Sequence, residues 1–314
     1  MAGPVNAQSG SNGRVYTHPV TGETAASVTT ILSGGVPKPA LTSWAAKMAA
    51  EYAAERIEEL ATLVKSEGDV GRREAIDRIK GAPWRQRDNK ADIGTAVHDV
   101  AEQIVLEGTN SVKVDDLGED VLPYVRAVYR FWRDWKPEPI VAEATVWSRE
   151  WGYAGTLDLI ADIDGYGRCL LDWKTSKGIY GEVALQLAAY VNADFVLLDD
   201  GTEMEIPHPI DQVGAVHLRP DGSYAVHLIP VDAIEPHWYG FLYAREVAHW
   251  MREHSKVAIP SAAARPTFDG TAPAPPLKSK MLKADWLAEA RRLNLDVSSK
   301  DTVKTIRAAV EAAR

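Results

Sequence analysis

Two aspartates and a lysine at strand spacing are the residues of this sequence whose types could do chemistry. Asp158 and Asp172 belong to two apolar runs joined by an Asp-Gly-Tyr-Gly sequence at residues 164–167, a composition typical of a β-hairpin turn. With the turn centred near Gly165, Asp158 is expected to face Asp172, with Cβ atoms about 4.5–5.5 Å apart. Lys174 follows Asp172 by two residues, so its side chain is expected on the same side of the strand.

Like charges that face each other within apolar strands are destabilising unless a cation lies between them. Carboxylate oxygens suit the hard cations Mg²⁺ and Mn²⁺, which can activate a water molecule and neutralise charge on a phosphate. Lys174 would hold or help to deprotonate the attacking water and stabilise the transition state. In the alternative interpretation the hairpin lies at the surface and its three charges face water. The leucines beside Asp158 and Asp172 favour an internal pair of strands.

Helical segments precede the hairpin and are expected to cover it. Residues 40–65 and 70–79 have helical patterns, the second ended by a Gly-Ala-Pro sequence. Together they are expected to form a cap whose aromatic residues belong to the core. Residues 92–106 form the clearest amphipathic helix, with His98 at the edge of its apolar stripe, and another helix is expected over residues 120–135.

The pattern becomes strand-like from residue 140 onward. Residues 140–147 are expected to form a strand before the hairpin, and residues 181–192 a helix after it. A second hairpin is expected over residues 213–229, followed by a long helix over residues 231–254. The expected fold class is therefore α/β, with a mixed central β-sheet flanked by helices.

Proline content separates a small C-terminal part from the rest of the chain. We expect an N-terminal extension and helical cap over residues 1–92, a core over 93–254, and a Pro/Ala-rich linker over 255–279. Residues 280–314 are expected to form a small helical module with two short helices, the second beginning near Ser298.

The composition limits the kinds of protein that this chain can be. An apolar share of 46% is ample for a packed core, and the net charge of −9 argues against a generic nucleic-acid binder. Basic residues nevertheless gather at residues 72–90 and 278–314, where they could contact phosphates. The sequence has no signal-peptide pattern and no apolar run of membrane-spanning length. We expect a soluble, cytoplasmic protein of a bacterial cell or a phage-infected host, with no membrane partner.

Other residues that commonly bind metals carry weaker signals. The single cysteine, Cys169, excludes a disulfide framework and any cysteine-ligated zinc or iron–sulfur cluster supplied by this chain alone. Its position inside a predicted strand indicates a buried, inert thiol. His217 and His227 lie nearly opposite each other on the second hairpin, and we interpret them as an exposed cross-strand pair.

Short motifs in a fixed order resemble a known family. Gly94-Thr-Ala-Val-His98, Gly155-Thr-Leu-Asp158, Asp172-Trp-Lys174 and Gln186-Leu-Ala-Ala-Tyr190 resemble the PD-(D/E)XK nuclease superfamily in its RecB-like form. Within that group the chain is most similar to phage-encoded exonucleases related to the CRISPR-associated exonucleases. Leu157 replaces the namesake proline, and the cysteines that bind an iron–sulfur cluster in many relatives are absent. The resemblance implies a restriction-endonuclease-like core without such a cluster.

The resemblance also implies a ligand set for the metal. His98, Asp158 and Asp172 would bind Mg²⁺ or Mn²⁺, with the backbone carbonyl of Trp173 as a further ligand. Taken alone, a helical histidine such as His98 is more often a satisfied core or surface residue. Glu143 on the preceding strand is an additional candidate ligand, and a solvent-facing glutamate is the alternative.

Further roles come from the same resemblance. The implied catalytic set is Asp158, Asp172, Lys174, Gln186 and Tyr190. Gln186 and Tyr190 would position Lys174 or contact the DNA backbone, although by spacing alone they are two polar residues on one helical face. Secondary candidates for phosphate contacts, for which solvated surface charge is the alternative, are Arg85, Arg87 and Lys177.

The resulting prediction is a metal-dependent DNA exonuclease. It would hydrolyse phosphodiester bonds at the ends of linear duplex or single-stranded DNA in recombination, repair or phage DNA metabolism, and the resemblance implies a 5′-phosphate product. The alternatives are a structure-specific endonuclease on the same core and an inactive nuclease-fold DNA-binding protein. A recombination or single-strand-binding protein is a candidate partner. The C-terminal module resembles SAP-like DNA-binding domains, and a helical hairpin for protein contacts is the alternative.

Overall fold

The computed structural model describes residues 6–10, 13–109, 111–113, 117–262 and 281–313, except for the side chains of residue 9 and residues 87–91. The chain divides into two compact units, Met1–Trp250 and Met251–Arg314. The first unit has a mixed α/β fold, and the second contains a pair of short helices. Among the described residues, no helix combines the length and the apolar character needed to cross a membrane.

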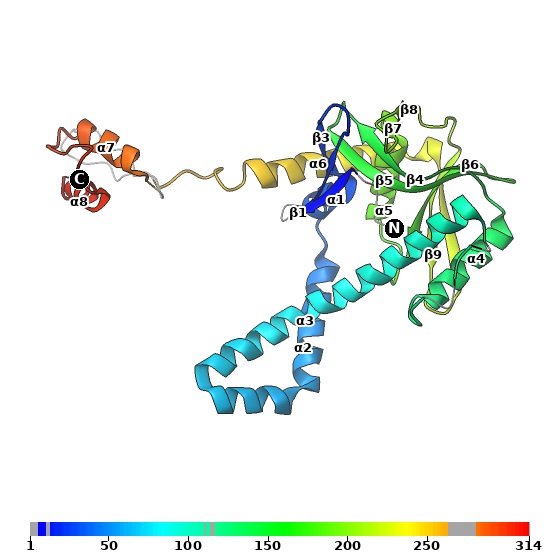
Figure 1. The fold of residues 1–314 in the computed structure, drawn as a ribbon, viewed down its shortest axis with the longest axis horizontal. Helices are drawn as coiled ribbons and strands as arrows, with labels where there is room; N and C mark the ends of the chain where they lie inside the picture. Colours follow the sequence, from blue (N-terminus) through cyan, green and yellow to red (C-terminus); the bar gives the residue numbers. More distant parts are fainter. Residues whose placement is uncertain (1–5, 11–12, 110, 114–116, 263–280, 314) are drawn as a thin grey trace. The chain divides into compact units, whose positions relative to one another are not determined.

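Ten strands of the described chain form one mixed sheet in the first unit (Figure 1). They are β1 (Ala7–Gly10), β2 (Gly13–Thr17), β3 (Thr24–Ser27), β4 (Glu138–Ser148), β5 (Tyr153–Ile163), β6 (Gly167–Lys174), β7 (Phe195–Leu197), β8 (Glu203–Met204), β9 (Gln212–Leu218) and β10 (Tyr224–Pro230). Neighbouring strands are antiparallel, except that β3 with β5 and β6 with β9 are parallel.

The sheet curls around its longest strands. β4 pairs along most of β5 on one side, while the other side of β5 pairs first with β3 and then with β6. β6 leads on to β9, and β9 to β10. A strand that changes partners along its length must bend, and the bend brings the N-terminal strands β2 and β3 toward the hairpin of β5 and β6.

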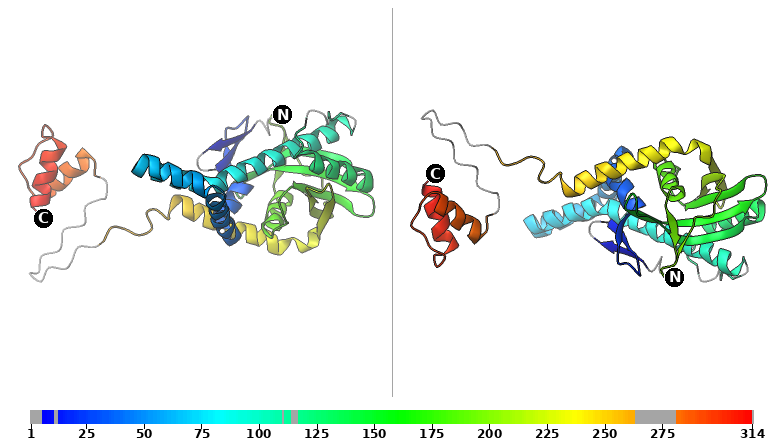
Figure 2. Two further views of the ribbon diagram at one scale, coloured as in Figure 1. Left: turned by 90° about the horizontal axis from the view of Figure 1, so that it is seen from below. Right: turned by 90° about the horizontal axis from the view of Figure 1, so that it is seen from above.

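Helices cover both faces of the sheet (Figure 2). On one face, α1 (Val28–Gly35), α5 (Glu182–Val191) and α6 (Glu235–Glu253) enclose a hydrophobic core. On the other face, α4 (Leu122–Trp135) and the C-terminal part of α3 (Ile57–Glu107) enclose a second core around Phe131 and Trp173. A 3₁₀ turn, Val231–Ala233, precedes α6. The predicted mixed sheet flanked by helices is confirmed.

The predicted hairpin is also confirmed. Strands β5 and β6 are joined by the three residues between Ile163 and Gly167, with Leu159 paired to Leu171. Gly165 has φ 78°, a left-handed conformation that suits glycine in a tight turn. Both strands are buried over most of their length, so the alternative of a surface hairpin is wrong.

The helices before the sheet differ from the prediction. The predicted helix over residues 40–65 ends early, because α2 (Pro39–Glu55) stops at Arg56. The helices predicted over residues 70–79 and 92–106 are parts of α3, which is interrupted only at Gly68 within its described course and continues through Pro83. Pro83 removes one backbone hydrogen bond, but it is buried, and packing of α3 against α2 offsets that loss. The predicted boundary between residues 92 and 93 therefore lies inside α3.

Together, α2 and the N-terminal half of α3 form a thin arm (Figure 1). None of the residues of α2 is buried, and Trp44, Met48 and Tyr52 are half-buried. The expectation that these side chains belong to the core is wrong, because an arm of packed helices offers each helix only one covered side.

The second unit contains α7 (Lys283–Arg292) and α8 (Val303–Ala312), as predicted. Trp286, Ala290, Ile306 and Val310 form its small core. The N-cap of α8 is Thr302, whose side chain accepts a hydrogen bond from the Thr305 amide, rather than Ser298.

Candidate metal centre

Three carboxylates lie in a row across three adjacent strands. The register of β4 with β5 places Glu143 opposite Asp158, and continuing the register of β5 with β6 places Asp158 opposite Asp172. Asp158 is 5% exposed and Asp172 is 1% exposed. Oδ2 of Asp158 accepts a hydrogen bond of 2.6 Å from the Trp173 amide, which ties the first strand of the hairpin to the second at this point.

Two features of Glu143 are energetically unfavourable. Its φ is 44°, a left-handed conformation that costs a non-glycine residue about 1–3 kcal/mol. Its Oε1 atom is buried and has no hydrogen-bond partner in the described part of the chain. Oε1 forms a long ion pair of 3.6 Å with Nδ1 of His98, and a bound cation would give this oxygen a closer partner.

His98 reaches this row from α3. Its Nδ1 atom lies 3.3 Å from Oδ1 of Asp158 and 3.6 Å from Oε1 of Glu143. Gly94, one turn earlier, lies beside the end of β6, where a Cβ atom would make an ordinary contact of 3.5 Å with Oγ1 of Thr175. The apolar stripe of this part of α3 packs in the second core and so fixes the side of the helix that carries His98.

The third carboxylate, Asp172, is fixed by its own partners. Lys174 forms an ion pair with Oδ2 of Asp172, and the side chain of Lys174 is 22% exposed. Nε2 of Gln186 on α5 donates hydrogen bonds to Oδ1 of Asp172 at 2.8 Å and to the Tyr190 hydroxyl at 2.9 Å. Gln186 and Tyr190 therefore position Asp172, which in turn holds Lys174.

Burial and charge set the protonation of the cluster. Burial raises the pKa of Glu143 to about 7, with Asp158 adding to the rise and His98 opposing it. Burial raises the pKa of Asp172 to about 6 against the lowering effect of Lys174. Burial acts to lower the pKa of His98, but the neighbouring carboxylates outweigh it, and this pKa lies well above its usual value. An imidazolium thus balances the acidic row, and metal binding would release its proton.

The cluster fits a metal ion. His98, Glu143 and Asp158 each offer a ligand atom, and these atoms lie within 4.8 Å of one another. Two carboxylates and an imidazole are common ligands of divalent cations. Of the predicted ligands, His98 and Asp158 converge with the additional candidate Glu143, while Asp172 is the next carboxylate in the row. The carbonyl of Trp173, directly after Asp172 in β6, stays a prediction.

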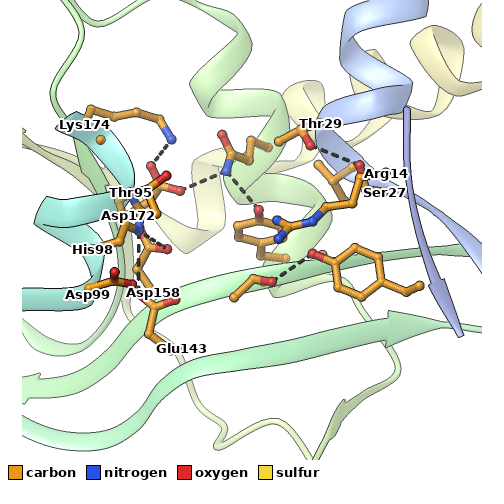
Figure 3. A pocket seen from close by; sticks show the side chains of 17 residues that line it. Arg14, Ser27, Thr29, Thr95, His98, Asp99, Glu143, Asp158, Asp172 and Lys174 are labelled. Carbon is orange, nitrogen blue, oxygen red and sulfur yellow. Dashed lines mark hydrogen bonds and ion pairs between the residues drawn. The ribbon is translucent and has the colours of Figure 1, made fainter. Parts of the chain in front are cut away.

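The row opens into a pocket of about 360 Å³ (Figure 3). His98, Glu143, Asp158, Asp172 and Lys174 lie on one side, and Arg14, Ser27 and Thr29 lie on the other. Arg14 comes from β2, with its guanidinium 5.8 Å from the Tyr16 ring centroid. The Tyr16 hydroxyl shares a hydrogen bond of 2.8 Å with Thr156, two residues before Asp158.

Sequence reasoning missed this second side of the pocket. Arg14, Ser27 and Thr29 precede the hairpin by more than a hundred residues, and no motif links them to it. Ser27 caps α1 by accepting a hydrogen bond from the Thr30 amide, so its local pattern indicates only a helix start. Asp99 and Thr95 on α3 also line the pocket and follow directly from the placement of His98.

Two of the secondary phosphate candidates, Arg85 and Lys177, lie outside the pocket. Arg85 donates a hydrogen bond of 2.8 Å to the carbonyl of Arg78 and lies 5.1 Å from the Tyr52 ring centroid, so it joins α3 to α2. Lys177 is exposed in the loop between β6 and α5. The side chain of Arg87 lies outside the described residues.

The two histidines of the second hairpin lie close together, with ring centroids 6.4 Å apart, but only His227 is exposed. His217 pairs with Ala225 rather than His227 in the register of β9 and β10. It is 7% exposed, and its Nε2 atom lies 2.8 Å from the carbonyl of Ser176. The prediction that it is exposed is wrong, because the loop after β6 folds over it. Cys169 is buried, as predicted.

Comparisons with protein-family models and curated proteins give no relative for this chain. No protein-family model matches the sequence, and a search of curated proteins finds no match.

Proposed function

We propose that the protein is a Mg²⁺- or Mn²⁺-dependent deoxyribonuclease that acts as an exonuclease on DNA ends. The observation that carries the proposal is the convergence of the row Glu143, Asp158 and Asp172 with His98 and Lys174 in one pocket. A structural role alone does not explain three carboxylates side by side in a buried sheet, because each raises the free energy of the others.

The origin of the site residues supports the nuclease assignment. Motifs on α3, β5, β6 and α5 meet at this pocket, in the chain order of the RecB-like form of the PD-(D/E)XK superfamily. The mixed sheet around the hairpin, covered by α5 on one face and α3 on the other, is the arrangement that a restriction-endonuclease-like core requires. We therefore extend the proposal to that core.

The charges around the pocket suit a phosphodiester. Lys174 and Arg14 bring positive charge to opposite sides of it, and hydroxyls of Ser27 and Thr29 lie beside Arg14 (Figure 3). Guanidinium and hydroxyl groups bind phosphate oxygens through charge-assisted hydrogen bonds. A substrate strand held by Arg14 would present its phosphate to the acidic row.

Each residue has a defined role in the proposed reaction. His98, Glu143 and Asp158 would hold the divalent cation with help from Asp172, and the cation would supply Lewis-acid chemistry when bound. The Lys174 ammonium donates a hydrogen bond to the attacking water and orients it, and Nζ can take the water's proton only when Lys174 is in its neutral amine form. The Asp172 carboxylate keeps that ammonium in place, and Gln186 fixes the carboxylate. Arg14 would bind a phosphate oxygen of the substrate strand on the side of the pocket opposite the acidic row.

Cleavage of labelled DNA tests the proposal. Linear duplex, single-stranded and closed circular DNA are incubated with the protein in Mg²⁺, Mn²⁺ or EDTA. We expect metal-dependent loss of linear DNA and intact circles. The Lys174→Ala variant is expected to lose at least a hundredfold in rate, the usual scale for a general acid–base group. Lys47→Ala, which removes a lysine of α2 whose side chain is 67% exposed, is the control and should retain the rate.

The possible outcomes are separable. Nicking of circles would assign an endonuclease on the same core, and DNA binding without cleavage in either metal would assign an inactive DNA-binding protein. Equal rates for wild type and Lys174→Ala would remove Lys174 from the chemistry. A thermal unfolding scan of each variant distinguishes loss of chemistry from loss of fold.

A further inference from the structure

Arg14 is held in place by a hydroxyl group from outside the pocket. Oγ1 of Thr30 accepts a hydrogen bond of 2.8 Å from the Arg14 amide and donates one of 3.2 Å to the Arg14 carbonyl. Thr30 is half-buried in the first turn of α1, and the described residues that line the pocket do not include it. Thr30 thus contacts the backbone of Arg14, while the side chain of Arg14 extends into the pocket (Figure 3).

These two hydrogen bonds replace a strand partner that is missing at this point. The pairing of β2 with β3 ends at Val15 and Ala26. The next pair in the same register would be Arg14 with Ser27, but the chain leaves β3 after Ser27 and begins α1. Backbone N–H and C=O groups need partners, and the hydroxyl of Thr30 serves both groups of Arg14.

The hydrogen-bonding capacity of the Thr30 hydroxyl is fully used. A hydroxyl group has one proton to donate and two lone pairs with which to accept. Besides its two bonds with Arg14, Oγ1 of Thr30 accepts a hydrogen bond of 2.9 Å from Oγ of Ser27. Ser27 also caps the Thr30 amide at 2.9 Å. Valine at position 30 would therefore remove the partner of both backbone groups of Arg14.

The residue before Arg14 is adapted to the close approach of Thr30. Gly13 has φ 99°, a left-handed conformation that favours glycine. A Cβ atom at Gly13 would lie 2.5 Å from Cγ2 and 2.6 Å from Oγ1 of Thr30. A larger residue at position 13 would thus push Thr30 away from the backbone of Arg14.

The guanidinium group of Arg14 stays available for a ligand. Within the part of the chain that the structure describes, Arg14 forms no ion pair, and its guanidinium lies 5.8 Å from the centroid of the Tyr16 ring. An arginine side chain is long and has many rotamers, so it reaches a fixed point only when its backbone is fixed.

We propose that Thr30 is a positioning residue, which holds the backbone of Arg14 so that its guanidinium meets a phosphate of the substrate strand. This inference rests on the proposed nuclease function. It adds to that function a residue outside the pocket that acts only through Arg14.

DNA binding in EDTA tests the inference without cleavage. Fluorescence anisotropy measures the affinity for fluorescein-labelled dT20 and for a labelled 20-bp duplex. Arg14→Ala is expected to weaken binding of the better-bound form about tenfold, the scale of one charge-assisted hydrogen bond. Thr30→Val removes the hydroxyl and is expected to weaken it about threefold to tenfold, because an effect that acts through Arg14 does not exceed the loss of Arg14 itself. Thr30→Ser keeps the hydroxyl and should stay within about twofold of wild type.

A double-mutant cycle separates positioning from a purely structural role. In the Arg14→Ala background, Thr30→Val should weaken binding no further, because the hydroxyl then has no guanidinium to position. If Thr30 only joined β2 to α1, its loss would lower the stability of the fold and affect binding equally in both backgrounds. Cleavage gives a second readout, since Thr30→Val should raise the KM for linear DNA more than it lowers kcat. Where wild type binds DNA too weakly in EDTA, the same cycle is measured from KM.

Two further variants control for the fold. Thr24→Val makes the same substitution at an exposed position of β3 and should leave affinity within about twofold. Gly13→Ala should reproduce the loss seen in Thr30→Val, because its Cβ atom displaces Thr30. Thermal unfolding followed by circular dichroism shows which variants are folded at the assay temperature. If Thr30→Val does not fold, Gly13→Ala with and without Arg14→Ala completes the cycle.

The results distinguish failure of this inference from failure of the proposed function. Affinity and KM of Thr30→Val within twofold of wild type, equal losses with and without Arg14, or a loss in Thr30→Ser as large as in Thr30→Val would overturn the positioning role. A wild type that shows the expected cycle in DNA binding but cleaves no DNA in Mg²⁺ or Mn²⁺ would refute the nuclease function and leave the positioning role intact. A wild type that neither binds nor cleaves DNA would overturn both.

Discussion

Replacement of Glu143 by glutamine separates a metal ligand from a structural residue. Glutamine keeps the size of the side chain and removes its charge. Because burial raises the pKa of Glu143 from 4.5 to about 7, ionisation of this carboxyl group opposes folding. The sign follows from linkage: the folded state binds the proton more tightly, so the contribution of Glu143 to stability is full below pH about 4.5 and is lost as the pH rises to about 7.

The size of the effect follows from the shift. A difference of about 2.5 pKa units corresponds to about 3 kcal/mol, because each unit is worth about 1.4 kcal/mol. His98 reduces this value, since the substitution also removes a carboxylate that stabilises its imidazolium. We expect Glu143→Gln to raise the free energy of unfolding by up to about 3 kcal/mol at pH 8 in EDTA, and to change it little at pH 4.5.

Metal is expected to stabilise the wild type more than it stabilises Glu143→Gln. A cation that binds only the folded protein stabilises it by RT ln(1 + [L]/Kd), about 2.7 kcal/mol at a hundredfold excess over Kd. Wild type should show this gain in Mn²⁺ at pH 8, and Glu143→Gln should lose most of it. Urea unfolding followed by tryptophan fluorescence measures both effects, with Glu138→Gln on an exposed position of β4 as the matched control.

A stability of Glu143→Gln below wild type in EDTA at pH 8 would refute the reasoning. It would mean that the Glu143 carboxylate is satisfied by the fold itself, so that the lack of a hydrogen bond at Oε1 has no bearing on metal binding. An equal gain in Mn²⁺ for both proteins would remove Glu143 from the ligand set while leaving His98 and Asp158 in it.

Three further predictions concern other parts of the structure. Burial raises the pKa of the Cys169 thiol to about 11, so this thiol should not react with a thiol-specific disulfide reagent at pH 8 until the protein is unfolded. A prompt reaction in the folded state would contradict its burial. Arg14→Ala should raise the KM for DNA about tenfold and lower kcat less, because the proposed contact of Arg14 with a phosphate lies across the pocket from the acidic row; an unchanged KM in steady-state cleavage assays would exclude that contact. Gly155→Ala should destabilise the fold by about 1–3 kcal/mol in urea unfolding, because the added Cβ atom would lie 2.5 Å from the Tyr190 ring. A variant as stable as the wild type would show that the ring can move aside.

Local sequence patterns were sufficient for the hairpin at the centre of the site. Strand alternation places Asp172 and Lys174 on one side, and the turn residues set the register that puts Asp158 opposite Asp172. The same is true of Gln186 and Tyr190, which lie one helical turn apart on α5 and form a hydrogen bond. These relations depend only on the periods of strands and helices, and so they are present in the sequence.

The length of α3 could not be predicted from local sequence patterns. Gly68 and the Gly-Ala-Pro sequence before Trp84 both indicate helix ends by local propensity. The interruption occurs at Gly68, but the helix continues through Pro83, because packing on α2 outweighs the local cost. Tertiary contacts routinely override propensities of this size.

The sequence by itself was enough to place Asp158, Asp172 and Lys174 together on one hairpin of the candidate site. Only the tertiary structure decided that Glu143 turns toward His98, that Arg14 lines the other side of the pocket, and that Arg85 packs against α2. The physical reason is that these positions depend on strand pairing and helix packing between segments far apart in the chain, where no local period constrains them.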